Sequence, residues 1–370
     1  MMESPAASID KQRQFPCKEC GANLVFTPGT NALTCPYCGT INEIERADEA
    51  VEELDFNRHF DQLASQQETE ERLTIRCDTC GAETSLAENR TADRCPFCGA
   101  GIVAQATSRK LIKPRSLLSF RITHEQAGAT FKQWIESRWF APSELKQRAH
   151  REQINGVYIP CWTYDAQTTS PYTGERGEDY WDTESYTAFE NGKHVARTRR
   201  VKKTRWWPAS GTVHVPFDDV LVLASQSLPR GYAEALEPWD LDQLTPYRDE
   251  YLSGFVAESY QIGLPEGFEV AKSMMEPGIH SAIRRDIGGD HQRIHSVDTH
   301  YHNVTFKHAL LPVWISAYRY HEKTYRFLVN ARTGEVQGER PYSWVKITLT
   351  VLMGAILALI VLLIASGGRF

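Results

Sequence analysis

An unbroken apolar run lies near the end of the chain. Residues 347–365, ITLTVLMGAILALIVLLIA, are nineteen consecutive residues without a charge. A helix of that length is about 28 Å long, close to the thickness of the hydrocarbon core of a bilayer. Tyr342 and Trp344 stand where interfacial aromatic residues are expected, and Arg340 and Lys346 place positive charge on the same side. The pattern predicts one transmembrane helix, with the N-terminal bulk of the chain in the cytoplasm.

The middle of the chain combines helical and strand periods. Apolar residues recur at helical spacing over 124–140, and Pro142 opens a second helical segment that reaches about residue 151. Further apolar patterns predict a run of short strands from Val157, with a hairpin turn at 191–192, then helices over 238–260 and 265–290, then strands over 300–306, 311–320 and 324–330. Asn330 to Gly334 is expected to form a tight hairpin. We interpret this region as a mixed α+β domain.

A weak internal repeat lies within that domain. Residues 159–164, IPCWTY, resemble residues 311–318, LPVWISAY, and both set an aromatic strand after a proline. The repeat predicts two β-rich halves, near 157–230 and 300–340, with helices packed on them.

A stronger repeat is formed by cysteines. The pattern CxxCGA starts at Cys17 and at Cys77, and the pattern CPxCG starts at Cys35 and at Cys95, so the two copies lie 60 residues apart. Fourteen residues separate the two CxxC pairs in each copy, which is enough for a β-hairpin that returns the chain to a shared ion. The eight predicted metal ligands are Cys17, Cys20, Cys35, Cys38, Cys77, Cys80, Cys95 and Cys98.

Four thiolates in each copy suit structural zinc. Zinc in closed four-cysteine sites is tetrahedral and keeps no position for water, so each of the two ions would supply folding energy rather than catalysis. Residues 1–14 hold no apolar core of the kind found in a secretory signal. We therefore expect a reducing compartment, where metal ligation is favoured over disulfides.

The segment between the two cysteine repeats, each of which we interpret as a zinc ribbon, is acidic. Residues 43–72 contain eleven acidic and three basic residues, a net charge of −8, whereas the whole chain carries −6. Its apolar residues recur at near-helical spacing, which predicts an amphipathic helix. We divide the chain into a flexible N-terminus (1–14), a first zinc ribbon (15–42), an acidic helical linker (43–73), a second zinc ribbon (74–104), an α+β domain (111–340), a transmembrane helix (347–365) and a short tail (366–370).

Sequence motifs for common enzymes are absent. Thr187 and His194 stand where a phosphate loop around Gly192-Lys193 would need glycine and Ser or Thr, and the chain has no HExxH or GxSxG. The ninth cysteine, Cys161, lies in a predicted strand and is expected to be a core residue. Five histidines between 291 and 308 leave a second metal site or a pH sensor as less favoured alternatives. We expect no enzymatic activity.

A basic run precedes two tryptophans in the predicted strands. Its members, without an acid between them, are Lys193, Arg197, Arg199, Arg200, Lys202, Lys203 and Arg205. Three interpretations stay open: a solvated strand face, a contact with anionic lipid headgroups near the anchor, and a nucleic-acid contact. Around the ribbons themselves charges of both signs are mixed, which favours a protein-facing or structural role over DNA binding.

The chain resembles one bacterial family over nearly its whole length. The resemblance lies in the two ribbons, in residues 204–229 with the FDDV segment, in residues 310–341 with the LPVW segment and in the terminal apolar run. Its members are often labelled primosomal protein N′ (replication factor Y) or helicase-like. The eight ribbon cysteines carry the similarity to the helicase's zinc-binding insert, but the motor motifs are absent, so helicase activity is not expected. Some members of the family are associated with flotillin-like band proteins and phage-shock protein A, which implies a membrane adaptor.

These features predict a tail-anchored, single-pass protein of the cell membrane. In the leading hypothesis its zinc ribbons recruit cytoplasmic protein partners, in a membrane-stress assembly of the flotillin-like or phage-shock protein A type. In the alternative hypothesis the chain is a membrane-tethered nucleic-acid-binding module, associated with replication and without helicase activity.

Overall fold

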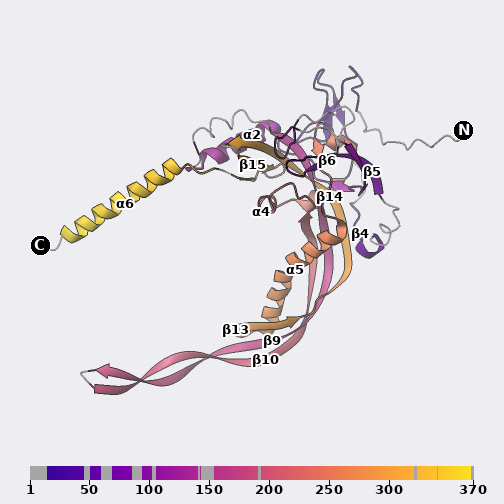
Figure 1. Ribbon diagram of the computed structural model, residues 1–370. Coiled ribbons are helices and arrows are strands. Elements are labelled where there is room, and N and C mark those ends of the chain that lie inside the picture. The colour runs from indigo at the N-terminus through magenta and orange to yellow at the C-terminus, as the bar shows by residue number, and fades with distance from the viewer. Residues whose placement is uncertain are drawn as a thin grey trace.

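The computed structural model describes residues 15–45, 51–59, 69–85, 94–101, 106–140, 142, 154–190, 193–320, 323–339 and 341–367. It is a mixed α+β structure in which one large sheet carries two small N-terminal sheets, and an apolar helix projects from its side (Figure 1). We call residues 111–339, which form most of the large sheet and its helices, the body. The second helix predicted after Pro142 and the turn residues 191–192 lie outside the described residues.

The large sheet has the strand order β10-β9-β14-β15-β16, and shorter strands pair along its edges. Its strands are β4 (Leu54–Asp55), β8 (Ser116–Leu117), β9 (Asn155–Glu190), β10 (Lys193–Leu223), β11 (Thr245–Pro246), β12 (Val256–Ala257), β13 (His291–Val297), β14 (His300–Tyr320), β15 (Lys323–Asn330) and β16 (Val336–Gly338). The helices are α2 (His124–Glu136), α4 (Arg230–Glu234), α5 (Leu264–Ile287) and α6 (Trp344–Gly367), with 3-10 turns η1 (Leu241–Gln243) and η2 (Asp249–Leu252).

Two very long strands replace the short strands predicted from Val157 onward. β9 and β10 form one antiparallel hairpin in which Glu190 pairs with Lys193, so only residues 191 and 192 lie between them. The prediction of short strands was wrong because Pro171, Pro208 and Pro216 do not end the strands. Pro208 and Pro216 lie in β10, the outer strand of the sheet, where the missing N–H of proline is tolerated, and Pro171 lies between the stretches of β9 that pair with β14 and with β13.

The sheet bends where two bulges flank the same part of β9. On one side the register of β10 shifts between Phe217 and Val220, and on the other side that of β14 shifts between His302 and Thr305. Asp219 and Asn303, one in each bulge, have φ of 49°. Bulges bend a strand and increase its twist, and this bend lies between the centre of the body and the distal part of the hairpin.

The two segments of the weak sequence repeat lie next to each other in the sheet. The two similar segments pair with each other at the middle of the sheet, Leu311 opposite Ile159. The Trp162 indole donates to the carbonyl of Ile262, and the Trp314 indole donates to that of Ile122. Each carbonyl lies two residues before a helix, α5 or α2 respectively. The two paired segments therefore each hold the start of one helix on the sheet.

The predicted helix over 265–290 is confirmed as α5, and the predicted helix over 124–140 is confirmed as the shorter α2. Phe131 and Ile135 of α2 are buried as expected, but the helix ends at Glu136 and Trp139 is exposed. The predicted helix over 238–260 was wrong. That segment forms η1, β11, η2 and β12, because its backbone pairs with β8 and with β9 instead of with itself.

The later strand predictions are confirmed in outline, although residues 300–320 form one strand instead of two. The hairpin at Asn330–Gly334 is present. The Asn330 side chain accepts hydrogen bonds from the backbone N–H groups of Arg332 and Thr333, and Gly334 has φ of 82°, a conformation that favours glycine. The turn returns the chain from β15 to β16.

The acidic segment differs from the single helix that its pattern predicts. In the described part it contains β4, helical residues 56–59 and the start of the strand at Thr69. Ile44 packs in one core cluster, whereas Leu54 and Phe56 pack on another. The apolar residues therefore contact separate parts of the body, and one helical stripe would not reach both.

Helix α6 contains the predicted span. Residues Trp344–Leu362 have a mean hydropathy of 2.5, and none of that stretch is buried. The helix begins beside the segment after α2, where the backbone N–H of Ser343 donates to Phe140 and Lys346 donates to the Trp139 carbonyl. It is long and apolar enough to cross a membrane. Its apolar side chains are exposed, whereas those of a core helix in a soluble protein are buried.

Candidate metal centres and their surroundings

Each CxxC pair forms a tight turn that aims its sulfur atoms at a common point. In the first pair the Cys17 N–H donates to Ala22 and the Gly21 N–H donates to the Cys17 carbonyl, and the same bonds recur at Cys35, Cys77 and Cys95. The glycine after each pair has φ between 71° and 76°. Only glycine adopts this conformation without strain, which explains why CxxCG recurs four times.

The eight predicted ligands gather into two groups of four. Ligand atoms within each group lie within 4.8 Å of one another. The Sγ atoms of Cys17 and Cys38 are 3.5 Å apart, as are those of Cys20 and Cys35, and the corresponding distances in the second group are 3.6 Å. A tetrahedral ion with metal–sulfur bonds of about 2.3 Å places its sulfurs about 3.8 Å apart. Both groups therefore fit structural metal sites.

Backbone amides favour the thiolate form at two cysteines of the first group. The N–H groups of Cys20 and Glu19 bond to the Cys17 sulfur and lower its pKa, and the N–H of Cys38 does so most strongly for the pKa of Cys35. A metal requires deprotonated thiols, so these amides prepare the sulfurs for an ion.

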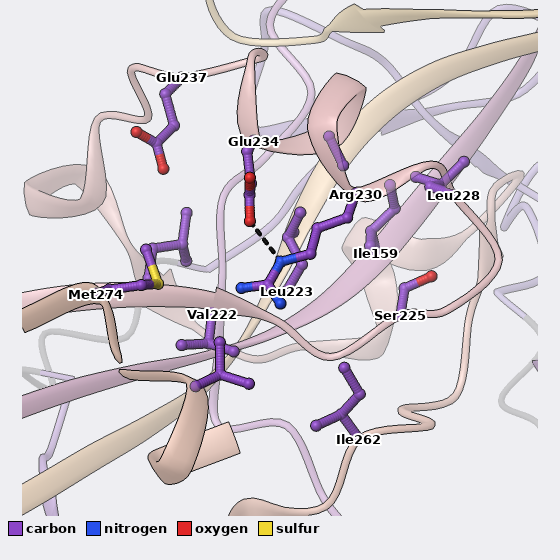
Figure 2. A pocket seen from close by; sticks show the side chains of 13 residues that line it. Ile159, Val222, Leu223, Ser225, Leu228, Arg230, Glu234, Glu237, Ile262 and Met274 are labelled. Atoms are coloured by element: carbon purple, nitrogen blue, oxygen red, sulfur yellow. Dashed lines mark hydrogen bonds and ion pairs between the residues drawn. The ribbon is translucent and has the colours of Figure 1, made fainter. Parts of the chain in front are cut away.

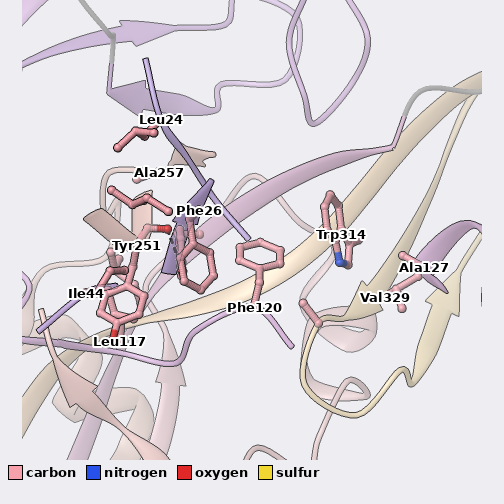
Figure 3. Close-up of a cluster of buried hydrophobic side chains, with 14 of the residues drawn as sticks. Leu24, Phe26, Ile44, Leu117, Phe120, Ala127, Tyr251, Ala257, Trp314 and Val329 are labelled. Atoms are coloured by element: carbon pink, nitrogen blue, oxygen red, sulfur yellow. Dashed lines mark hydrogen bonds between the residues drawn. The ribbon is translucent and has the colours of Figure 1, made fainter. Parts of the chain in front are cut away.

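The first ribbon consists of β1 (Val25–Phe26), β2 (Ala32–Thr34) and β3 (Ile41–Glu43). Phe26 and Leu24 enter a core cluster with Phe120 and Tyr251 of the body, shown in Figure 3. The Phe26 N–H donates to Ser253 at 3.0 Å, and the Gly29 N–H donates to Phe120 at 2.9 Å. One side of this ribbon is therefore fixed to the body.

The second ribbon consists of β5 (Thr69–Arg76), β6 (Glu83–Ser85) and β7 (Ala106–Ile112). Its cysteines Cys77 and Cys95 belong to a core cluster with Val157 and Val313 of the central strands. The Gln261 side chain donates to the Gly81 carbonyl at 2.8 Å, next to Cys80. The second ribbon thus packs against the central strands of the large sheet.

The two ribbons differ at one equivalent position. Tyr37 and Phe97 each stand between proline and cysteine in the CPxC turn, yet Tyr37 is 84% exposed and Phe97 is 0% exposed. Ile41, just after the first turn, is 67% exposed. Cys20 and Cys38 are also exposed, whereas Cys80 and Cys98 are partly covered. The first ribbon therefore presents an apolar surface to solvent that the second ribbon buries.

Cys161 is a core residue in the structure. Its thiol is fully buried between strands and donates to the Ala309 carbonyl at 3.4 Å. Burial raises the pKa of this thiol, which keeps it protonated and poorly nucleophilic.

The five histidines of residues 291–308 do not converge. His291, His295 and His300 each lie near a different carboxylate, namely Asp179, Glu175 and Asp298. Among the residues that the structure describes, the groups with metal-ligand geometry contain no histidine. The histidines therefore provide no second metal centre here.

Sequence reasoning missed one cluster of charged groups at the bulges. Asp165, Asp218 and Asp219 lie together, and the nearly buried Lys307 ammonium approaches Asp219 at 2.7 Å and Glu53 at 3.1 Å. Desolvation raises the pKa of Asp165 to about 6. The FDDV segment was the signal for this cluster, because its second aspartate takes the positive φ that the bulge requires. Lys307 and the bulge backbone engage these carboxylates, which indicates a structural role.

A cleft lies beside the second ribbon (Figure 2). It opens to solvent and is lined mainly by apolar residues, including Ile159 and Leu228 of the cluster that holds Cys77. Its charged residues are Arg230, Glu234 and Glu237, of which Arg230 and Glu234 are paired at 2.6 Å. Neither histidine nor cysteine is among its lining residues.

The chain is similar to the uncharacterized protein YdjG of Bacillus subtilis (strain 168), with 26% identity over 361 residues. The match covers 96% of this chain and 99% of that protein. No family model matches the chain, and no solved structure matches it.

Proposed function

We propose that the protein is a membrane-anchored adaptor that recruits a cytoplasmic protein through its first ribbon. The observation that carries the proposal is the contrast between exposed Tyr37 and buried Phe97 at equivalent positions. An exposed aromatic residue on a rigid turn supplies much contact area with little loss of conformational entropy, which suits a binding hot spot. The second ribbon, with its turn in the core, supports the sheet.

In this proposal both cysteine groups hold zinc. Zinc prefers four thiolates in a closed tetrahedron, and each group supplies four sulfurs at suitable distances. With no protein ligand missing, the ion would stabilise the ribbon instead of activating water. The role of zinc is to keep the first ribbon folded, so that Tyr37 and Ile41 stay in a fixed arrangement.

Helix α6 is the proposed anchor in the cell membrane. Its apolar length supports a single span, and the charges of Arg340 and Lys346 support an orientation with the ribbons in the cytoplasm. The resemblance to the bacterial ribbon family makes phage-shock protein A and flotillin-like band proteins the first partners to test. Such partners would place the adaptor in a membrane-stress assembly.

The nucleic-acid alternative has weaker support. Part of the basic run is engaged by carboxylates of β9: Lys202 lies 2.6 Å from Asp179, and Lys203 lies 2.8 Å from Asp182. Pairs of this kind reduce the number of cations available for phosphates. A salt titration with DNA and RNA separates the two functions, because phosphate binding weakens steeply with salt whereas an apolar contact at Tyr37 does not.

The test uses the full chain in detergent or nanodiscs with the candidate partners from the same bacterium. Tyr37→Ala should weaken binding by roughly thirty-fold, as expected for a hot spot of about 2 kcal/mol, with two metal ions retained. Trp139→Ala, which removes another exposed aromatic residue far from the ribbon turn, is the matched control and should bind normally.

If neither candidate binds, affinity purification from solubilised membranes replaces them. A protein recovered with the wild type and lost with Tyr37→Ala supports the proposal. Equal recovery of every protein by the wild type, by Tyr37→Ala and by a chain lacking the first ribbon would refute it.

A further inference from the structure

The distal part of the β9–β10 hairpin has no cover in the described fold. The pairing of β9 with β13 ends at Gly177, and beyond it β9 and β10 pair as strands only with each other for 13 residue pairs, from Glu178–Arg205 to Glu190–Lys193. At the base of this stretch Asp179 still contacts Asp290 and His291. We call residues 178–205 the arm. At about 3.3 Å per residue it is about 40 Å long. Isolated two-stranded ribbons are marginally stable in water, so an arm of this length needs a surface to lie on.

The exposed side chains of the arm combine large aromatic rings with cations. Trp181 is 61% exposed and Phe189 is 68% exposed. Arg200 lies over the Trp181 ring with its guanidinium 5.4 Å from the centroid, and Arg205 lies over the Tyr180 ring at 4.9 Å. Trp and Tyr beside Arg and Lys are typical of the interface between water and lipid, where apolar rings meet charged headgroups.

The charge of the arm favours an anionic surface over a second copy of the chain. Residues 178–205 contain seven basic and five acidic residues, a net charge of +2. Polybasic segments gain attraction at anionic leaflets. Charged side chains along both strands also oppose edge-to-edge pairing with another arm.

The position of the arm agrees with a membrane contact. The arm and α6 extend from the body toward the same side (Figure 1). The beginning of α6 is held on the body by hydrogen bonds from Ser343 and Lys346 to the segment after α2. A bilayer that contains α6 therefore lies on the side toward which the arm projects.

From these observations we infer that the arm is a second membrane contact. It lies against the anionic headgroups of the bilayer that holds α6, with the rings of Trp181 and Phe189 in the interface. The inference uses the anchor of the proposed function and does not depend on recruitment by the first ribbon.

The test is photocrosslinking of the full chain in nanodiscs. The photoreactive residue p-benzoylphenylalanine replaces Phe189 in the arm, Ile356 in α6 or Tyr37 in the first ribbon, and lipid adducts are measured by mass spectrometry. Ile356 reports on the anchor and Tyr37 is the exposed control outside the membrane. We expect adducts at Ile356 and Phe189 but not at Tyr37.

Charge dependence distinguishes binding from chance proximity. Adduct yield at Phe189 should fall roughly ten-fold in phosphatidylcholine relative to phosphatidylglycerol, and a similar loss should follow Arg200→Gln with Arg205→Gln. The control pair Lys18→Gln with Arg58→Gln makes the same charge change outside the arm and should leave the yield unchanged.

Three results would overturn the inference. Adducts at Ile356 without adducts at Phe189 would reject the arm contact and leave the anchor intact. An absence of adducts at both positions would reject the anchor, and the arm contact with it. Crosslinks from Phe189 to a second copy of the chain, or to DNA or RNA added to the nanodiscs, in place of lipid would assign the arm to that partner.

Discussion

The two nearly identical metal turns differ in the surroundings of one position, which is Tyr37 in the first turn and Phe97 in the second. The sequences CPYCG and CPFCG predict the same local structure, and the backbone hydrogen bonds are indeed the same in both. The environment differs: Phe97 packs with Val157 and Val313, whereas Tyr37 faces solvent. The sequence alone does not reveal this difference, because the covering residues lie far from the turn along the chain.

Truncation of these two rings should therefore change the free energy of unfolding by very different amounts. Phe97→Ala leaves a cavity in the core and should lower the free energy of unfolding by about 3–5 kcal/mol, as for other buried rings. Tyr37→Ala should change stability by less than about 0.5 kcal/mol, as for other exposed residues. Thermal melting of the two metal-loaded variants beside the wild type measures both effects. Equal losses of stability would contradict the assigned environments.

Among the elements, some were predictable because their signal is local. The cysteine spacing predicts two closed metal groups, and α5 follows from an apolar period of 3.6 residues. The length of β9 and β10 was not predictable, since the arm exposes both faces and provides no alternation of buried and exposed positions. The segment 238–260 was mispredicted because its partners are the distant strands β8 and β9.

Two indole groups hold the starts of α5 and α2 on the central strands. Trp162→Phe or Trp314→Phe removes the donor to a helix-leading carbonyl, and each should lower stability by about 1–3 kcal/mol. The two losses should be nearly additive because the bonds lie at separate helix starts. Trp207→Phe, at an exposed position, is the control.

Denaturant unfolding of the wild type, the three single variants and the Trp162→Phe, Trp314→Phe double variant, monitored by near-ultraviolet circular dichroism, provides the measurement. Unfolding midpoints of the Trp162 and Trp314 variants that equal that of the wild type would show that the bonds do not hold the helices.

At the scale of the whole molecule the ribbons are joined to the body by core packing, so metal and fold should be coupled. We expect two zinc ions per chain by elemental analysis. Cys77→Ser should lose one ion and lower the melting temperature of the body, because Cys77 packs in the same cluster as the central strands. Membrane insertion through α6 should persist.

Acid should release both ions, because protons compete with the metal for the thiolates. If the Cys77→Ser variant still holds two zinc ions per chain, the assignment of the second cysteine group as a metal site is contradicted.

The crossed tryptophan bonds also set an order of events during synthesis. The carbonyl that Trp314 requires, at Ile122, is made long before the tryptophan itself, but the carbonyl that Trp162 requires lies 100 residues later in the chain. At about 5–20 residues per second, the apolar face of β9 waits roughly 5–20 seconds on the ribosome for α5 to cover it. During that interval the part of β9 that α5 covers in the folded protein stays exposed on the nascent chain.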